Sequence, residues 1–134
     1  KLRLKGGCHD VFFVTTLERV PEYARIMNEL ADSCRYPATD IGVYVQPMVQ
    51  GCNCHCEFNL TYDPTNSTEV EKIKKLVTEG ARALADKGAY FSRPYGAWAD
   101  IAYSHISGEN VVALRKTKGI FDPNGILNPG KLCF

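Results

Sequence analysis

The sequence lacks any apolar run close to the roughly 20 residues that a membrane-spanning helix needs. It also lacks a block of basic residues. Its 16 Lys and Arg residues are nearly balanced by 15 Asp and Glu residues. So small a charge imbalance gives no case for binding nucleic acid or an anionic membrane surface. No internal repeat or low-complexity tract interrupts the 134 residues. We therefore expect a globular chain that can bury a core.

No methionine begins the chain, and no signal-peptide pattern follows Lys1. We therefore expect this sequence to be a piece of a longer polypeptide. Its six cysteines lie at positions 8, 34, 52, 54, 56 and 133, scattered through apolar segments. Together with the missing secretory signal, this scatter favours thiols in a reducing compartment over disulfides and predicts a cytoplasmic location.

The order of strand-like and helix-like segments predicts the fold class. Strands are expected at 9–17, 41–48, 52–62 and 89–94, and helices at 21–34 and 68–88. Thr68 and Glu71 have the spacing of a capping box at the start of the second helix. This order is the ferredoxin-like βαββαβ motif, an α+β fold in which two helices cover one face of a four-stranded antiparallel sheet.

We predict that this ferredoxin-like domain occupies residues 1–94. A helical C-terminal tail is expected over residues 95–134, with one helix around 98–103, another around 109–119, and a turn-rich end.

The segment GCNCHCEFNLTYDP, residues 51–64, holds three cysteines, a histidine and a glutamate within six positions. Alternate side chains of a strand point to opposite faces of the sheet. One face would then be apolar and pack against the helices, since an unmodified cysteine behaves as a small hydrophobe. The residues of this apolar set are Cys52, Cys54, Cys56, Phe58 and Leu60.

The other face of the same strand would be uniformly polar. Its members are Asn53, His55, Glu57 and Asn59, and the neighbouring strand adds Tyr44 and Gln46. Burying such a row without partners would be costly. The face is therefore either solvated or the roof of an active site supplied mostly by another domain, and the strand alone does not decide between the two.

A metal site in this segment conflicts with strand geometry. Side chains two positions apart on a flat strand are about 6.6 Å apart, whereas thiolates that share one Zn²⁺ lie about 3.8 Å apart. No second CxxC or HxxxH motif supplies further ligands. We predict no metal, and a Cys/His metal module remains only a third interpretation.

The segment RKTKGIFDPNGILNPGKLCF, residues 115–134, resembles the C-terminal end of flavoprotein oxidoreductases of the vanillyl-alcohol oxidase / p-cresol methylhydroxylase family. In those enzymes a helix leads into a D-P-N-x-I-L-x-P-G-K-like turn, here Asp122 to Lys131. The resemblance extends back through GAYFSRPYGAWADIAYS and the βαββαβ segment, so it covers nearly the whole chain.

The resemblance implies a cap domain whose sheet covers the isoalloxazine ring of FAD and the substrate. It implies an N-terminal FAD-binding domain in the same polypeptide, absent from this chain, onto which the tail would pack. The expected reaction is hydride transfer from a phenolic or benzylic alcohol, or a hydroxy acid, to FAD, and the fragment alone should be inactive. Its partners would be the FAD domain and a small-molecule substrate, while an electron-acceptor protein and a second copy of the chain stay open.

The resemblance also implies roles for single residues. Counted back from GAWAD, Arg93 matches the arginine of a Tyr-Arg pair that contacts the phenolate of 4-alkylphenols. The tyrosine position is Ser92, a departure that puts a phenolic substrate in question, with Tyr90 as a substitute. The predicted catalytic residues are Arg93, Glu57 and His55; the predicted substrate-binding residues are Tyr44, Gln46, Asn53, Asn59 and Tyr90; the predicted cofactor contacts are Arg93, Asn128 and Lys131.

Two other interpretations stay open. The branch that resembles glycolate oxidase subunits and D-lactate dehydrogenases has metal-binding histidines, but Glu57 stands at one of them and SRPYG replaces EHGIG. A carboxylate facing the flavin fits the phenol-oxidising branch better. The runner-up from another class is a stand-alone ferredoxin-like module that binds a ligand or a partner without redox activity.

Overall fold

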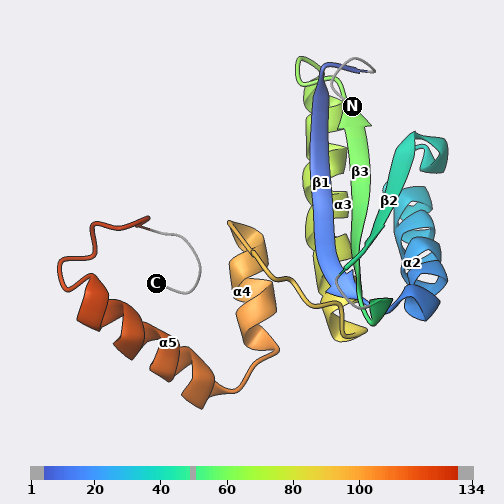
Figure 1. The fold of residues 1–134 in the computed structure, drawn as a ribbon. Helices are drawn as coiled ribbons and strands as arrows, with labels where there is room; N and C mark the ends of the chain where they lie inside the picture. The colour runs from blue at the N-terminus through green and yellow to red at the C-terminus, as the bar shows by residue number, and fades with distance from the viewer. Residues whose placement is uncertain (1–4, 49–50, 130–134) are drawn as a thin grey trace. The chain divides into compact units, whose positions relative to one another are not determined.

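The computed structural model describes residues 5–48 and 51–129, which belong to two compact units, Lys1–Ser92 and Arg93–Phe134. Each unit is described by itself (Figure 1). The first contains β1 (Gly7–Thr15), the 3-10 helix η1 (Leu17–Arg19), α2 (Val20–Ser33), the 3-10 helix η2 (Ala38–Asp40), β2 (Ile41–Pro47), β3 (Cys54–Tyr62) and α3 (Ser67–Asp86). The second contains α4 (Ala97–Ser104) and α5 (Gly108–Phe121).

The described residues of the first unit form a three-stranded antiparallel sheet covered by two helices. The strand order is β1-β3-β2, so β3 is the central strand. α3 packs against β1 and β3, α2 packs against α3, and Figure 1 shows α3 behind the strands. The predicted α+β fold is confirmed, and its two long helices and first three strands lie within two residues of their expected bounds.

The predicted fourth strand at residues 89–94 is reduced to a single bridge. Tyr90 exchanges two backbone hydrogen bonds with Val14, with N···O distances of 2.8 and 3.1 Å, on the open edge of β1. The segment has little room to extend this ladder. Gly88 turns the chain with a φ of 84°, and Pro94 has no N–H to donate to a neighbouring strand.

The buried face of the sheet carries the apolar residues. The ring of Phe13 on β1 meets the ring of Tyr23 on α2 edge-on, with centroids 4.9 Å apart. Cys54 and Cys56 are buried, as predicted, but Cys52 is exposed because β3 begins only at Cys54. The fully buried larger side chains of the two strands are Val11, Phe13, Cys54, Cys56, Phe58 and Leu60.

α2 and α3 approach closely at Gly80. A Cβ added to this glycine would lie 2.9 Å from the Met27 sulfur, closer than such atoms normally come. A larger residue here would push Met27 out of the space between the two helices.

The start of α3 differs from the predicted capping box. Asn66 is the N-cap, and its side-chain oxygen accepts from the backbone N–H groups of Thr68 and Glu69 at 3.1 and 3.3 Å. Glu69 in turn accepts from the backbone of Asp63 at 2.9 Å. Glu71, the predicted partner of Thr68, pairs with a lysine one turn on. Asn caps helices better than Thr, so the helix begins two residues earlier than the Thr68 cap implied.

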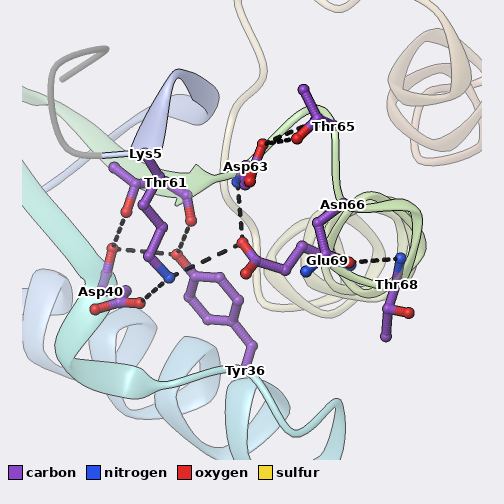
Figure 2. Close-up of polar contacts among 9 residues, drawn as sticks. All are labelled: Lys5, Tyr36, Asp40, Thr61, Asp63, Thr65, Asn66, Thr68 and Glu69. Carbon is purple, nitrogen blue, oxygen red and sulfur yellow. Dashed lines mark hydrogen bonds and ion pairs between the residues drawn. The ribbon is translucent and has the colours of Figure 1, made fainter.

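A polar cluster joins this helix start to the end of the sheet (Figure 2). Lys5 Nζ lies 2.7 Å from a carboxylate oxygen of Asp40 and 3.9 Å from one of Glu69. The buried Tyr36 hydroxyl lies 2.9 Å from the carbonyl oxygen of Thr61 and 3.2 Å from that of Asp40. The cluster therefore ties the loop before β2 to the end of β3.

In the second unit, both predicted helices are present, and a tight turn follows α5. The Asp122 carboxylate accepts from the backbone N–H groups of Ile126 and Leu127 at 2.9 and 3.0 Å and from Lys118 Nζ. Gly125 closes the turn with a φ of 63°. The turn predicted from the DPNG sequence is thus confirmed.

Candidate functional site

The candidate site is the sheet face opposite the helices, which we call the polar face. Its centre is formed by His55, Glu57 and Asn59 of β3. The register places Glu57 between Phe12 of β1 and Tyr44 of β2. The His55 and Glu57 side chains keep 20% and 15% of their surface exposed, so both are held against the sheet yet remain accessible.

Hydrogen bonds join the polar side chains of this face. Glu57 Oε2 lies 3.2 Å from His55 Nε2. The amide nitrogen of Asn59 donates to Glu57 Oε1 and, at 2.9 Å, to Asp10 Oδ1 on β1. An amide nitrogen carries two hydrogens, so it can serve both carboxylates at once. Asn59 is only 8% exposed, which limits competition from water for these bonds.

Two aromatic rings flank the His55 imidazole. Phe12 stacks on it with centroids 5.8 Å apart, and Tyr44 meets it edge-on at 6.2 Å. The Tyr44 hydroxyl donates to the side chain of Gln46 at 3.1 Å. These contacts orient the imidazole and give the polar face an aromatic patch beside its carboxylates.

The structure brings together five of the predicted site residues: Tyr44, Gln46, His55, Glu57 and Asn59. Asn53 lies before β3 and is exposed. Tyr90 is 66% exposed at the β1 edge, where its backbone pairs with Val14.

The remaining predicted residues belong to the second unit or lie outside the described residues. Arg93 is exposed and is the first residue of the second unit. Asn128 is exposed in that unit with a φ of 47°. Lys131 lies outside the described residues.

Asp10 and Phe12 belong to the polar face, although the sequence analysis did not select them. The alternation of HDVFFVT contains the signal, because Asp10 and Phe12 alternate with the buried Val11 and Phe13. Their position opposite Asn59 and Glu57, however, depends on the strand register, which alternation does not reveal.

The buried cysteines lie on the opposite face of the sheet and do not have the character of metal ligands. Burial, with smaller effects from Cys54 and Glu57, raises the pKa of Cys56 to about 12, and burial also raises the pKa of Cys54. A metal binds the thiolate form, which burial disfavours here. Within residues 5–48 and 51–129, no group of three or more His, Cys, Asp or Glu side chains is arranged to hold a metal ion.

Comparison with known families identifies the chain. The family described as "FAD linked oxidases, C-terminal domain" matches residues 12–132, which is nearly the whole chain. The chain belongs to this family. No curated protein and no solved structure matches the sequence.

As a C-terminal domain of an FAD-linked oxidase, the chain is part of an FAD-dependent oxidoreductase, and its family implies an N-terminal FAD-binding domain as its partner. In the described part of the chain, no helix combines the length and apolar character needed to cross a membrane.

Proposed function

We propose that the polar face covers the flavin ring and the substrate of an FAD-dependent oxidoreductase that takes a hydride from a phenolic or benzylic alcohol or a hydroxy acid. The observation that carries this proposal is the Glu57–His55 pair. Glu57 Oε2 and His55 Nε2 lie 3.2 Å apart, and both side chains are partly exposed on the polar face. A carboxylate and an imidazole in contact on an accessible surface are suited to moving a proton to or from a bound molecule.

The residues of this face suit the flavin ring of FAD but not its pyrophosphate. β1, β2 and β3 contain no Lys or Arg, and the face carries the carboxyl groups of Asp10 and Glu57. Such a surface does not suit the pyrophosphate of FAD, which needs cationic side chains or backbone N–H groups. It does suit a neutral ring system and the hydroxyl of a substrate. This supports an arrangement in which the N-terminal domain would bind the pyrophosphate of FAD.

Bound FAD supplies the hydride acceptor, and the side chains of this chain handle the rest of the substrate. Glu57, oriented by His55, would accept the proton of the substrate hydroxyl or guide a water molecule. Tyr44 and Gln46 would orient the substrate through hydrogen bonds. Asn59 gives its amide hydrogens to two carboxylates and would therefore position Glu57 more than contact the substrate.

The remaining roles rest on the sequence, and those of Arg93, Asn128 and Lys131 rest on the family resemblance. Arg93, which is always charged, would stabilise a phenolate or carboxylate of the substrate and negative charge on the reduced flavin. Tyr90 would stand in for the tyrosine replaced by Ser92. Asn53 would contact the substrate, and Asn128 and Lys131 would contact FAD. The tail, residues 95–134, would pack on the FAD domain.

The phenol-oxidising branch, typified by vanillyl-alcohol oxidase and 4-cresol dehydrogenase, is the finer assignment we propose. Glu57 supports it, because this carboxylate stands where the hydroxy-acid branch has a metal-binding histidine. Ser92 argues against it, because the tyrosine that contacts a phenolate in that branch is a serine at this position. Substrate tests should therefore include benzylic alcohols without a phenol group.

The test uses the full-length, FAD-containing protein mixed anaerobically with phenolic alcohols, benzylic alcohols and hydroxy acids. We expect one class to bleach the visible flavin absorption. Glu57→Gln should then slow the bleaching by about 100-fold or more, in the range of a lost general base, without releasing FAD. Glu71→Gln, an exposed change on α3, is the matched control and should behave as wild type.

A full-length protein that binds no FAD would contradict the proposed reaction and favour a ligand-binding module. Unchanged bleaching by Glu57→Gln would contradict the role given to the polar face.

A further inference from the structure

Asp10 connects β1 to the proposed proton-handling pair through a single amide. It lies directly opposite Asn59 in the antiparallel pairing of β1 with β3. We infer that Asp10 is a positioning residue, which holds the Asn59 amide so that the Glu57 carboxylate stays turned toward His55. This inference rests on the proposed function, in which Glu57 exchanges a proton with the substrate.

The distances give the two oxygens of Glu57 different tasks. Oε1 accepts from the Asn59 amide, and Oε2 lies 3.2 Å from His55 Nε2. The same amide nitrogen lies 2.9 Å from Asp10 Oδ1. With one hydrogen directed to each carboxylate, the amide plane is fixed from both sides, and so is the oxygen of Glu57 that binds it.

The opposite orientation of the Asn59 amide is unfavourable. Turned over, its oxygen would face two carboxylate oxygens that also only accept hydrogen bonds when ionised. Asp10 therefore does more than add one bond, since it removes the alternative in which the Asn59 amide turns away from Glu57. An acceptor at position 10 is the feature that this role requires.

Neighbouring residues leave room for the arrangement. Gly42 of β2 faces Asn59 from the other side, and a Cβ there would lie 3.3 Å from the Asn59 Cβ. The Cys8 thiol donates to the same Asp10 oxygen at 3.2 Å. Asp10 is thus held from its own strand, while the absence of a side chain at Gly42 keeps β2 from crowding Asn59.

The test compares two changes at Asp10 in the full-length, FAD-loaded protein. Asp10→Asn keeps an oxygen that can accept from Asn59, whereas Asp10→Ala removes it. The first readout is the ¹⁵N resonance of His55 Nε2 at fixed pH, which reports the bond to Glu57. The His55 signal is assigned by its loss in His55→Gln.

We expect Asp10→Ala to move this resonance most of the way to its position in Glu57→Gln, and Asp10→Asn to leave it near wild type. Adding Asp10→Ala to Glu57→Gln should cause no further movement. Asp32→Asn, an exposed charge change on α2, is the matched control. Equal movement by Asp10→Asn and Asp10→Ala, or no movement by Asp10→Ala, would overturn the inference.

The second readout is flavin reduction by the compound that bleaches the wild-type protein. Asp10→Ala should lower the limiting rate of reduction by about ten- to a hundred-fold, as expected for a misplaced catalytic group, with a smaller change in KM. Asp10→Asn should recover most of that loss. If no compound bleaches the wild-type protein but the resonance pattern holds, the positioning role stands and the proposed reaction fails.

Discussion

Asn59→Asp is the sharpest test of the arrangement in which a neutral amide lies between the carboxylates of Asp10 and Glu57. The change keeps the side-chain shape but replaces the donor amide with a third carboxylate beside Asp10 and Glu57. Asp10 and Glu57 both bond to this position, and the titratable neighbours of these two carboxylates are Cys8, His55 and Tyr44. Three ionised carboxylates cannot share the site, so the new aspartate must take up a proton in the folded chain.

The cost follows from the proton that must be bound. An ordinary aspartate has a pKa near 3.9, so protonating it at about pH 7 costs roughly 4 kcal/mol. The protonated acid can still donate to one carboxylate, but it loses the second charged bond, worth about 1.5–3 kcal/mol. We expect the free energy of unfolding at about pH 7 to fall by roughly 5.5–7 kcal/mol, a large share of the total for a domain of this size.

Acid should restore much of this loss. The pKa of the new side chain would be higher in the folded than in the unfolded chain, so the folded state binds more protons and gains stability as the pH falls. At about pH 4 the unfolded aspartate is already about half protonated, and the proton-uptake cost shrinks to roughly 0.5 kcal/mol. The deficit relative to wild type should therefore narrow by about 3.5 kcal/mol.

The assay is urea denaturation of residues 1–134, followed by far-ultraviolet circular dichroism at both pH values. Asn28→Asp makes the same chemical change on the exposed side of α2 and should cost little at either pH. A loss for Asn59→Asp below about 1 kcal/mol at neutral pH, or an equal loss at both pH values, would refute the arrangement described here.

Three further predictions follow from individual contacts. Tyr36→Phe removes the hydroxyl beside the Thr61 carbonyl and should lower the free energy of unfolding by about 1 kcal/mol; urea denaturation showing no loss would contradict that contact. Because burial raises the pKa of Cys56 to about 12, iodoacetamide should label this thiol only after unfolding, and mass spectrometry showing rapid labelling in the folded chain would count against it. Lys118 and two backbone N–H groups hold the pKa of Asp122 below its ordinary 3.8. The ionised carboxylate should therefore stabilise its turn above about pH 3.8, and this stabilisation should be lost as the pH falls below that value. NMR signals of the turn amides that already shift near neutral pH would contradict this.

Periodicity in the sequence predicted the two faces of β3, because Cys54, Cys56 and Phe58 alternate with polar neighbours. Periodicity could not predict which residues of β1 lie opposite those of β3. The Asp10–Asn59 contact depends on the register of two strands that are far apart in sequence, and nothing local specifies it.

The errors have local physical causes. Asn66 and Thr68 both have capping side chains, and Asn66, the better cap of the two, is the one that begins α3. The residues at 89–94 have strand-like composition, yet Pro94 and the turn at Gly88 leave pairing only at Tyr90.

An experimental structure of the full-length protein with FAD bound tests the central claim most directly. Our account predicts that the flavin ring lies against the polar face, with Glu57 and His55 beside the substrate position and Asn59 still bonded to Asp10. A flavin placed against the helices α2 and α3, or a polar face open to solvent, would contradict it.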